Sequence, residues 1–151
     1  MSEAWARYEQ IKQYSNMLQR DYISRLIREF MAALQRYLEK NEAGARRKTA
    51  EDLFRQYFGS YEFYHTASKD DIMSSFEKYP QEERISRMEM LAELYYAEAD
   101  DRPEPFRTQQ LDMTLSLFSF IDANSRTFSI DRQNKISLIK KKIYDSGKAG
   151  K

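Results

Sequence analysis

The sequence predicts an all-α protein of about six helices. Gly occurs only 4 times and Pro only 3 times in 151 residues, whereas strand-rich folds need many tight turns that use both residue types. No segment alternates apolar and polar residues as a half-buried strand does; apolar residues instead recur at steps of three and four, as on one face of a helix. Together with an aromatic content of 14%, this length fits one domain with a sizeable core.

The first forty residues predict one long helix. The NEAG sequence at 41–44 supplies its stop, with Gly44 near the C-terminal cap. From Tyr22 onward a second apolar row, which includes Ile27 and Met31, widens the apolar stripe into a core face. The stripe before Tyr22 is narrower, and this part extends beyond what the other helices can cover.

Two shorter helices are introduced by capping patterns. Thr49 and Asp52 have the spacing of a capping box, and Gly59 ends the helix that they open. Ser68 opens the next helix with the same spacing, and Pro80 closes it. The aromatic stretch GSYEFYHTAS lies between these two helices and is interpreted as a loop or a helical turn that buries rings.

Two longer helices follow at residues 82–99 and 104–121. Both carry apolar residues at helical spacing, and the prolines of ADDRPEP make that segment the clearest loop in the chain. The small residues Ala92 and Ala99 suit a close approach between helices. The lengths of the pair and the LAELYYAEAD pattern indicate an antiparallel hairpin similar to a tetratricopeptide unit, although no second copy occurs at the period of ~34 residues expected for that repeat.

Ser129 is expected to cap a last helix with a buried stripe at Ile136, Ile139 and Ile143. Phe128, just before the cap, is expected to anchor the entering chain. The sequence thus predicts a single helical domain over residues 1–145 and a flexible tail over residues 146–151.

Two segments resemble a family of small, uncharacterised bacterial proteins, the domain of unknown function DUF6483. DYISRLIREFMAALQRYL at 21–38 is similar to the opening helix of that family, and RTFSIDRQNKI at 126–136 is similar to its final segment. The resemblance covers most of the chain from Asp21 and includes the tetratricopeptide-like hairpin. The first twenty residues and the aromatic YFGSYEFYH stretch depart from the family pattern. The family carries no established activity, so the resemblance implies a fold and no catalytic residue.

Several kinds of chemistry lack the residues that they need. Without cysteine the chain has no disulfide, no thiolate metal site and no cysteine nucleophile, which fits a reducing compartment. The four glycines form no phosphate-binding motif. His65 is the only histidine, and Glu89 and Glu93 share a helix face without the Glu-x-x-His motif of di-metal bundles. We therefore predict a non-enzymatic protein with no catalytic residue, cofactor or metal site.

The expected localisation rests on the lack of a recognisable signal peptide and of a membrane-spanning segment in the sequence. The N-terminal sequence is charged throughout and has no signal-peptide core. No window approaches the ~20 apolar residues that cross a bilayer. The expectation is a cytosolic protein without a membrane partner.

Nucleic-acid binding is the alternative function. Its candidate residues are two basic clusters, Arg46–Lys48 and Lys140–Lys142, which would contact phosphates. The formal net charge of +1 argues against it, since such proteins carry a clear basic excess.

A helical module that binds a protein or peptide partner is the leading hypothesis, with the hairpin presenting a concave face. The N-terminal helix, which also carries Met17, is a candidate for self-association into a homodimer. The aromatic stretch 57–65 either lines a pocket or only packs between short helices. The candidate interaction surface comprises Trp5, Tyr8, Ile11, Tyr61, Tyr64 and His65.

Overall fold

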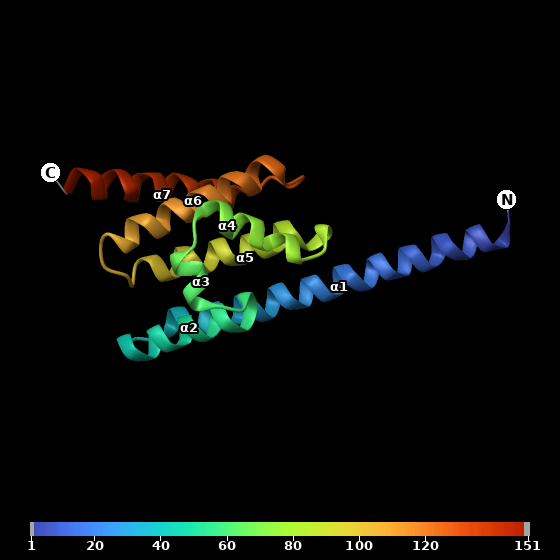
Figure 1. Ribbon diagram of the computed structural model, residues 1–151, viewed down its shortest axis with the longest axis horizontal. Coiled ribbons are helices and arrows are strands. Elements are labelled where there is room, and N and C mark those ends of the chain that lie inside the picture. The colour runs from blue at the N-terminus through green and yellow to red at the C-terminus, as the bar shows by residue number, and fades with distance from the viewer. Residues whose placement is uncertain (1, 150–151) are drawn as a thin grey trace.

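The computed structural model describes residues 2–149, and over this range all the regular secondary structure is helical, as predicted (Figure 1). It contains seven α-helices, one more than expected, because part of the aromatic stretch forms a short helix of its own. A 3₁₀ helix, η1 (Ser75–Lys78), follows the fourth of them. The α-helices are α1 (Glu3–Glu39), α2 (Ala43–Phe58), α3 (Tyr61–Thr66), α4 (Lys69–Ser74), α5 (Gln81–Ala99), α6 (Phe106–Asn124) and α7 (Ile130–Ala149).

The long helices form a layered bundle around α5 (Figure 1). On one side α5 packs against α1, which pairs with α2; on the other it packs against α6, which in turn pairs with α7. Helices α5, α6 and α7 run alternately in opposite directions, and α3 and α4 cross the bundle between its two sides. Leu91, Ala92 and Leu94 of α5 are fully buried, as expected for a helix that is covered on several faces.

Only the C-terminal half of α1 belongs to this bundle. Its buried residues are Phe30, Leu34 and Tyr37, and the rings of Phe30 and Tyr57 meet edge to face at 5.0 Å. The N-terminal half projects away from the other helices as a single rod (Figure 1).

Helix α2 begins earlier than the sequence predicts. The Glu42 carboxylate accepts hydrogen bonds from the backbone N–H groups of Gly44 at 2.8 Å and Ala45 at 2.7 Å, and these bonds lower the pKa of Glu42. An acid that satisfies free N–H groups at the helix start replaces the predicted Thr49 cap. Gly44 therefore lies in the first turn of α2 and does not cap α1, while the Thr49 hydroxyl donates to the Ala45 carbonyl at 2.8 Å.

The other predicted caps are confirmed. The Ser68 hydroxyl accepts a hydrogen bond from the Asp71 N–H at 3.1 Å, and the Ser129 hydroxyl accepts one from the Arg132 N–H at 3.1 Å. Helix α3, in the stretch interpreted from the sequence as a loop or a helical turn, has a cap of its own, because the Ser60 hydroxyl accepts from the Phe63 N–H at 3.0 Å.

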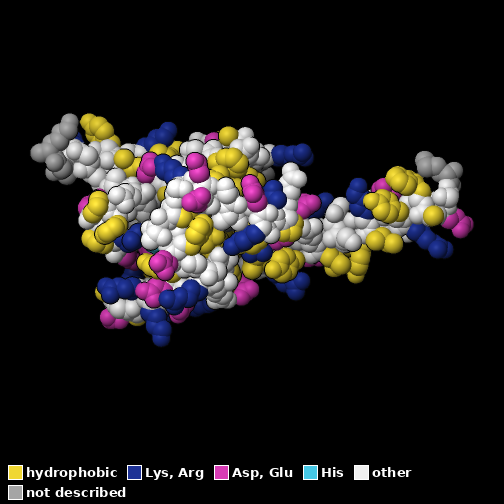
Figure 2. Space-filling model, viewed as in Figure 1, with side chains coloured by type: hydrophobic (Ala, Val, Ile, Leu, Met, Phe, Trp, Pro, Cys, Tyr) yellow, Lys and Arg dark blue, Asp and Glu magenta, His cyan; other side chains and the backbone are white. Residues whose placement is uncertain are grey.

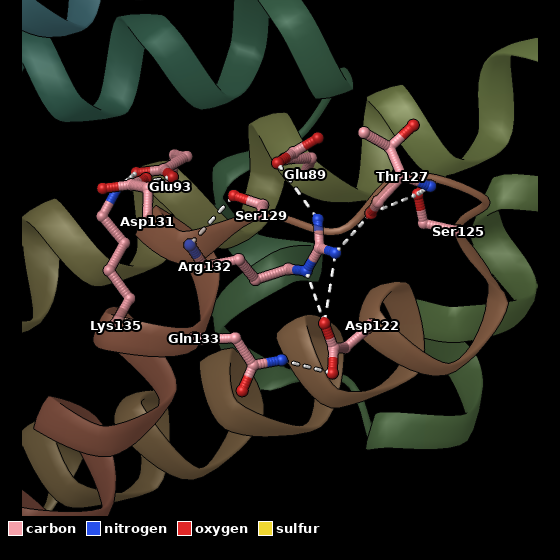
Figure 3. Close-up of polar contacts among 10 residues, drawn as sticks. All are labelled: Glu89, Glu93, Asp122, Ser125, Thr127, Ser129, Asp131, Arg132, Gln133 and Lys135. Atoms are coloured by element: carbon pink, nitrogen blue, oxygen red, sulfur yellow. Dashed lines mark hydrogen bonds and ion pairs between the residues drawn. The ribbon is translucent and has the colours of Figure 1, made fainter.

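A buried polar cluster fixes α7 to the bundle (Figure 3). Arg132, which is 4% exposed, donates to Asp122 of α6 at 3.1 Å and to the Thr127 carbonyl at 2.9 Å. Lys135 pairs with Glu93 of α5 at 2.6 Å. Burial raises the pKa of Glu93, and the hydrogen bond and charge of Lys135 oppose that shift. The segment RTFSIDRQNKI, which contains Arg132 and Lys135, therefore holds the last helix in place.

The packing of α7 confirms one expectation and corrects another. Ile136 and Ile139 are buried, with exposed fractions of 8% and 0%. Phe128, however, is 73% exposed and does not anchor the chain, because the Arg132 contacts hold the preceding turn. Helix α7 continues through Ala149, so the tail predicted from residue 146 is helical over 146–149; its last two residues lie outside the described range.

Candidate functional site

The projecting half of α1 carries an exposed apolar stripe. We define the α1 stripe as Ala4, Tyr8, Ile11, Ser15, Leu18 and Tyr22. Its four large side chains have exposed fractions between 49% and 66%. Trp5 and Tyr14 flank the stripe on its two sides, while Met17 lies toward the outer side of the helix; all three are more than half exposed. Hydrophobic side chains gather along this rod in the space-filling view (Figure 2).

The stripe and the buried face of α1 point in different directions. Phe30, Leu34 and Tyr37 face the bundle, and the stripe lies about a quarter of a turn around the helix from them. Gln19, beside the stripe, donates to Glu82 of α5 at 3.4 Å and marks the point where the bundle begins. The bundle of the same chain therefore leaves the stripe uncovered.

A second candidate site is a buried histidine–carboxylate pair. His65 of α3 and Glu98 of α5 meet at 2.6 Å, and both side chains are 5% exposed. The opposite ring nitrogen, Nδ1, lies 2.6 Å from the Tyr61 carbonyl, and Glu98 also accepts from Gln110 at 2.9 Å. Arg102 donates in turn to the Gln110 amide oxygen at 2.7 Å. The network joins α3, α5 and α6.

The partners of the ring fix its protons. A carbonyl only accepts hydrogen bonds, so Nδ1 of His65 carries a proton. One further proton lies between Nε2 and the Glu98 carboxylate. Both ring nitrogens are thus occupied by groups of the fold, and neither contact is a nucleophile of the kind that a catalytic triad requires. The geometry gives His65 a structural role, because both ring nitrogens contact groups of the same fold.

Two cavities flank this pair. One of about 320 Å³ is lined by His65 and Gln110, and another of about 390 Å³ is lined by Glu98 and Tyr61. Arg102 borders both. The Tyr61 ring stacks on His65 with 3.8 Å between ring centres. Burial and, after it, the charge of Glu98 raise the pKa of Tyr61 to about 12, so its phenol stays protonated at neutral pH.

The second cavity also contains a tyrosine–aspartate–arginine contact. The Tyr37 hydroxyl donates to Asp101, and Arg46 pairs with the same carboxylate at 2.9 Å. Burial, followed by the hydrogen bond to Asp101, raises the pKa of Tyr37. Arg46 also donates to the Lys40 carbonyl at 2.8 Å, so its guanidinium joins the end of α1 to the α5–α6 loop.

The basic clusters meet at one end of the molecule. Arg46 of the first cluster pairs with Asp101, and Lys142 of the second pairs with the adjacent Asp100 at 3.3 Å. One cation of each cluster is therefore engaged by an aspartate, which weakens the joint positive field that phosphate binding needs. The remaining four residues, 47, 48, 140 and 141, are exposed.

The predicted interaction surface divides into two separate groups. Trp5, Tyr8 and Ile11 lie together on the projecting rod, each more than half exposed. The α3 residues belong to the bundle: Tyr64 is 3% exposed, and the His65 side chain is buried with Glu98. Tyr64 and the His65 side chain are therefore largely covered by the bundle and contribute to the lining of the cavity of about 320 Å³.

Parts of both sites escaped the sequence reasoning. Leu18 and Tyr22 were placed on the apolar face of the first helix but not in the predicted interaction surface, and Tyr14 extends the exposed surface beside them. For Leu18 and Tyr22 the alternating steps of four and three residues were the available signal. Glu98 and Gln110 complete the buried network, but nothing in their local sequence links them to His65. The His65–Glu98 contact joins two helices, and its residues are 33 positions apart in the sequence.

No protein-family model, curated protein or solved structure matches this chain. Within residues 2–149 no helix has the length and apolarity to cross a membrane. The same part of the chain holds no group of three or more metal-ligating side chains.

Proposed function

We propose that this protein is a helical interaction module whose projecting half of α1 binds a protein partner. The observation that carries the proposal is the α1 stripe, whose four large apolar side chains stay exposed between 49% and 66%. Contiguous exposed apolar surface of this kind marks an interaction site. A cytosolic setting and the resemblance to the uncharacterised bacterial family complete the proposal.

The separation between rod and bundle supports it. In proteins most of the stability of a helix comes from tertiary packing of its apolar face. The projecting half of α1 lacks such packing, although most of its large apolar residues lie on or beside one face. A partner that covers this face would supply the missing packing energy. The aromatic residues Trp5, Tyr8 and Tyr14 are of the type enriched in interfaces.

The hairpin of α5 and α6 is the less suitable contact surface. Its tetratricopeptide-like character belongs to the proposal, but α1 packs on α5 and α7 packs on α6. A concave face for a peptide is therefore occupied by helices of the same chain. The stripe, in contrast, is free of the bundle.

Affinity capture from a lysate of the source cells tests the proposal. The bait is the full chain, compared with the double variant Ile11→Glu/Leu18→Glu in the stripe and with Gln13→Glu on the opposite face of the rod. We expect a partner, or a differently tagged copy of the chain, to be retained by the wild type and by Gln13→Glu and lost by the double variant. Identical captured sets for all three baits would contradict the proposal.

A further inference from the structure

We propose that the partner of the α1 stripe is a second copy of this chain, bound antiparallel so that Arg7 of each copy lies beside Asp21 of the other. This inference rests on the proposed function and specifies its occupant. It follows from the spacing of the stripe, the charges at its two margins and the area that the rod exposes.

The stripe has the spacing of a two-helix coiled coil. Steps of four and three residues alternate from Ala4 to Tyr22, the 3.5-residue repeat that keeps one seam against a partner helix. In heptad terms Tyr8, Ser15 and Tyr22 occupy the a positions, and Ala4, Ile11 and Leu18 occupy the d positions.

The residues beside the seam decide the direction of the partner. One margin, the g positions, holds Arg7, Tyr14 and Asp21. The other margin, the e positions, carries Lys12 between Trp5 and Gln19. Such flanking residues form the interhelical charge pairs that set partner orientation.

A parallel pair places each g residue beside the e residue five positions later on the partner. Arg7 would then face Lys12 of the second copy, twice in the symmetric dimer. Like charges in such positions are destabilising. No pair of opposite charge along this margin offsets the repulsion.

An antiparallel pair matches g with g across the seam. With the two-fold axis near Tyr14, Arg7 lies beside Asp21 of the second copy, and symmetry repeats the ion pair. The two Tyr14 rings meet at the axis. One unfavourable contact remains, between the two Lys12 side chains, but their flexible stems can carry the charges toward solvent. Opposite charges therefore favour the antiparallel arrangement.

The exposed area suffices for a stable interface. A large aromatic side chain can bury about 200 Å², and the rod holds Trp5, Tyr8, Tyr14 and Tyr22 about half exposed, together with Ile11 and Leu18. At roughly 100 Å² for each side chain, two copies bury about 1,200 Å², at the lower limit of standard interfaces. The predicted dimer is therefore reversible and dependent on concentration.

Charge reversal measured by sedimentation equilibrium separates the two directions. We expect Arg7→Asp and Asp21→Arg to weaken dimerisation about tenfold each, since each creates two like-charge contacts, and the double variant Arg7→Asp/Asp21→Arg to restore the wild-type Kd. In a parallel dimer Arg7→Asp would instead strengthen association, because it converts the Arg7–Lys12 repulsion into attraction. Gln13→Asp on the outer face is the matched control and leaves Kd unchanged.

Cysteine cross-linking tests the register independently, since the chain has no cysteine of its own. Ala4→Cys and Tyr22→Cys are prepared separately with different tags, mixed and oxidised. The antiparallel seam places these positions in one layer and gives the mixed disulfide. In a parallel seam they are about 27 Å apart, at 1.5 Å per residue, and each variant would link only to itself.

The outcomes separate this inference from the proposed function. A mixed disulfide with charge-swap rescue supports the antiparallel dimer. Self-linked disulfides with stronger association of Arg7→Asp overturn the inference while leaving the stripe as an interface. A monomer at all concentrations, with no cross-link, also overturns it. In that case the lysate capture decides the proposed function by itself.

Discussion

Among single residues, His65 is the one whose role changed most between sequence and structure. Its Nε2 lies 2.6 Å from Glu98, and both side chains are 5% exposed. Removing one partner of a buried, hydrogen-bonded polar pair leaves the other partner unsatisfied. We expect His65→Ala to lower the free energy of unfolding by about 3 kcal/mol, measured by urea denaturation.

An exposed ion pair gives the comparison for that experiment. Arg55 and Asp52 approach to 3.9 Å with side chains 61% and 59% exposed. Such pairs contribute ~0–1 kcal/mol, so Asp52→Ala should lower stability far less than His65→Ala. Equal effects of the two substitutions would show that the His65–Glu98 pair is not a structural element of the bundle.

The buried phenols predict how stability depends on alkaline pH. The pKa of Tyr61 rises from 10.0 to about 12, and burial also raises the pKa values of Tyr37 and Tyr95. A raised pKa in the folded state gives stability that is complete below the unfolded value and is lost as the pH rises. The contribution of these phenols to the free energy of unfolding should therefore be complete below pH 10 and be lost from pH 10 toward 12.

Phenolate absorbance, followed together with helical circular dichroism, checks this prediction. Full phenolate absorbance should develop only as the helix signal disappears, and Tyr61→Phe should make the fall in stability less steep. Complete ionisation of all tyrosines in a chain that keeps its helix signal would contradict the burial of these rings.

At the scale of helices, the ends of α2 and α7 give a matched glycine test. Gly59 caps α2 with φ of 97°, a left-handed conformation that costs other residues roughly 1–2 kcal/mol. Gly147 lies within α7 and has open space where a Cβ would be added. We expect Gly59→Ala to lower the melting temperature. Gly147→Ala should raise it slightly, because Ala favours a helix over Gly by about 0.5–1 kcal/mol of free energy. The reverse order would contradict the assigned helix ends.

The packing of α7 has its own matched pair. Ile139 is 0% exposed and its neighbour Leu138 is 48% exposed. Ile139→Asp creates a buried unpaired carboxylate and should cost about 3 kcal/mol or more, while Leu138→Asp should cost about 0.5 kcal/mol. Thermal melts of both variants measure the difference. Similar small losses would show that α7 is a loosely attached end and not the closing helix.

The sequence predicted helices better than their boundaries. Serine caps at 68 and 129 were found because their hydroxyls act within three residues. The start of α2 was missed, because the Glu42 carboxylate performs the cap that Thr49 was expected to provide. Phe128 was expected to be packed, but its environment depends on where Arg132 holds the turn. Helix caps that act within a few residues could be predicted from the sequence. Caps and packing that depend on tertiary contacts could not.

At the scale of the whole molecule, the exposure of the candidate site also depends on tertiary contacts that the sequence does not show. The sequence indicated that the first helix is longer than the other helices can cover. In the structure its N-terminal half projects from the bundle (Figure 1). The sequence could not separate Tyr8 and Ile11, which remain exposed, from Tyr64, which is buried. All three are large apolar residues at helical spacing, and only the arrangement of the helices decides which are covered.

If the projecting half of α1 serves only as an interface, the bundle does not need it for its own stability. Removal of residues 1–18 leaves Gln19, Phe30 and the rest of the buried face of α1 in place. We expect the shortened chain to keep its melting temperature at low protein concentration, where the full chain is dissociated. A loss of several degrees under those conditions would show that the projecting half of α1 stabilises its own bundle.

Amide hydrogen exchange at two protein concentrations tests the interface most directly. In the dissociated chain the rod lacks tertiary packing, so its amides should exchange rapidly, while those around Leu91 and Leu94 in the core should exchange slowly. We expect that raising the protein concentration protects the amides of residues 4–22 from exchange and leaves exchange in the core unchanged. Exchange in residues 4–22 that is the same at both concentrations, across the range in which a reversible dimer forms, would contradict the claim that the α1 stripe binds a second copy.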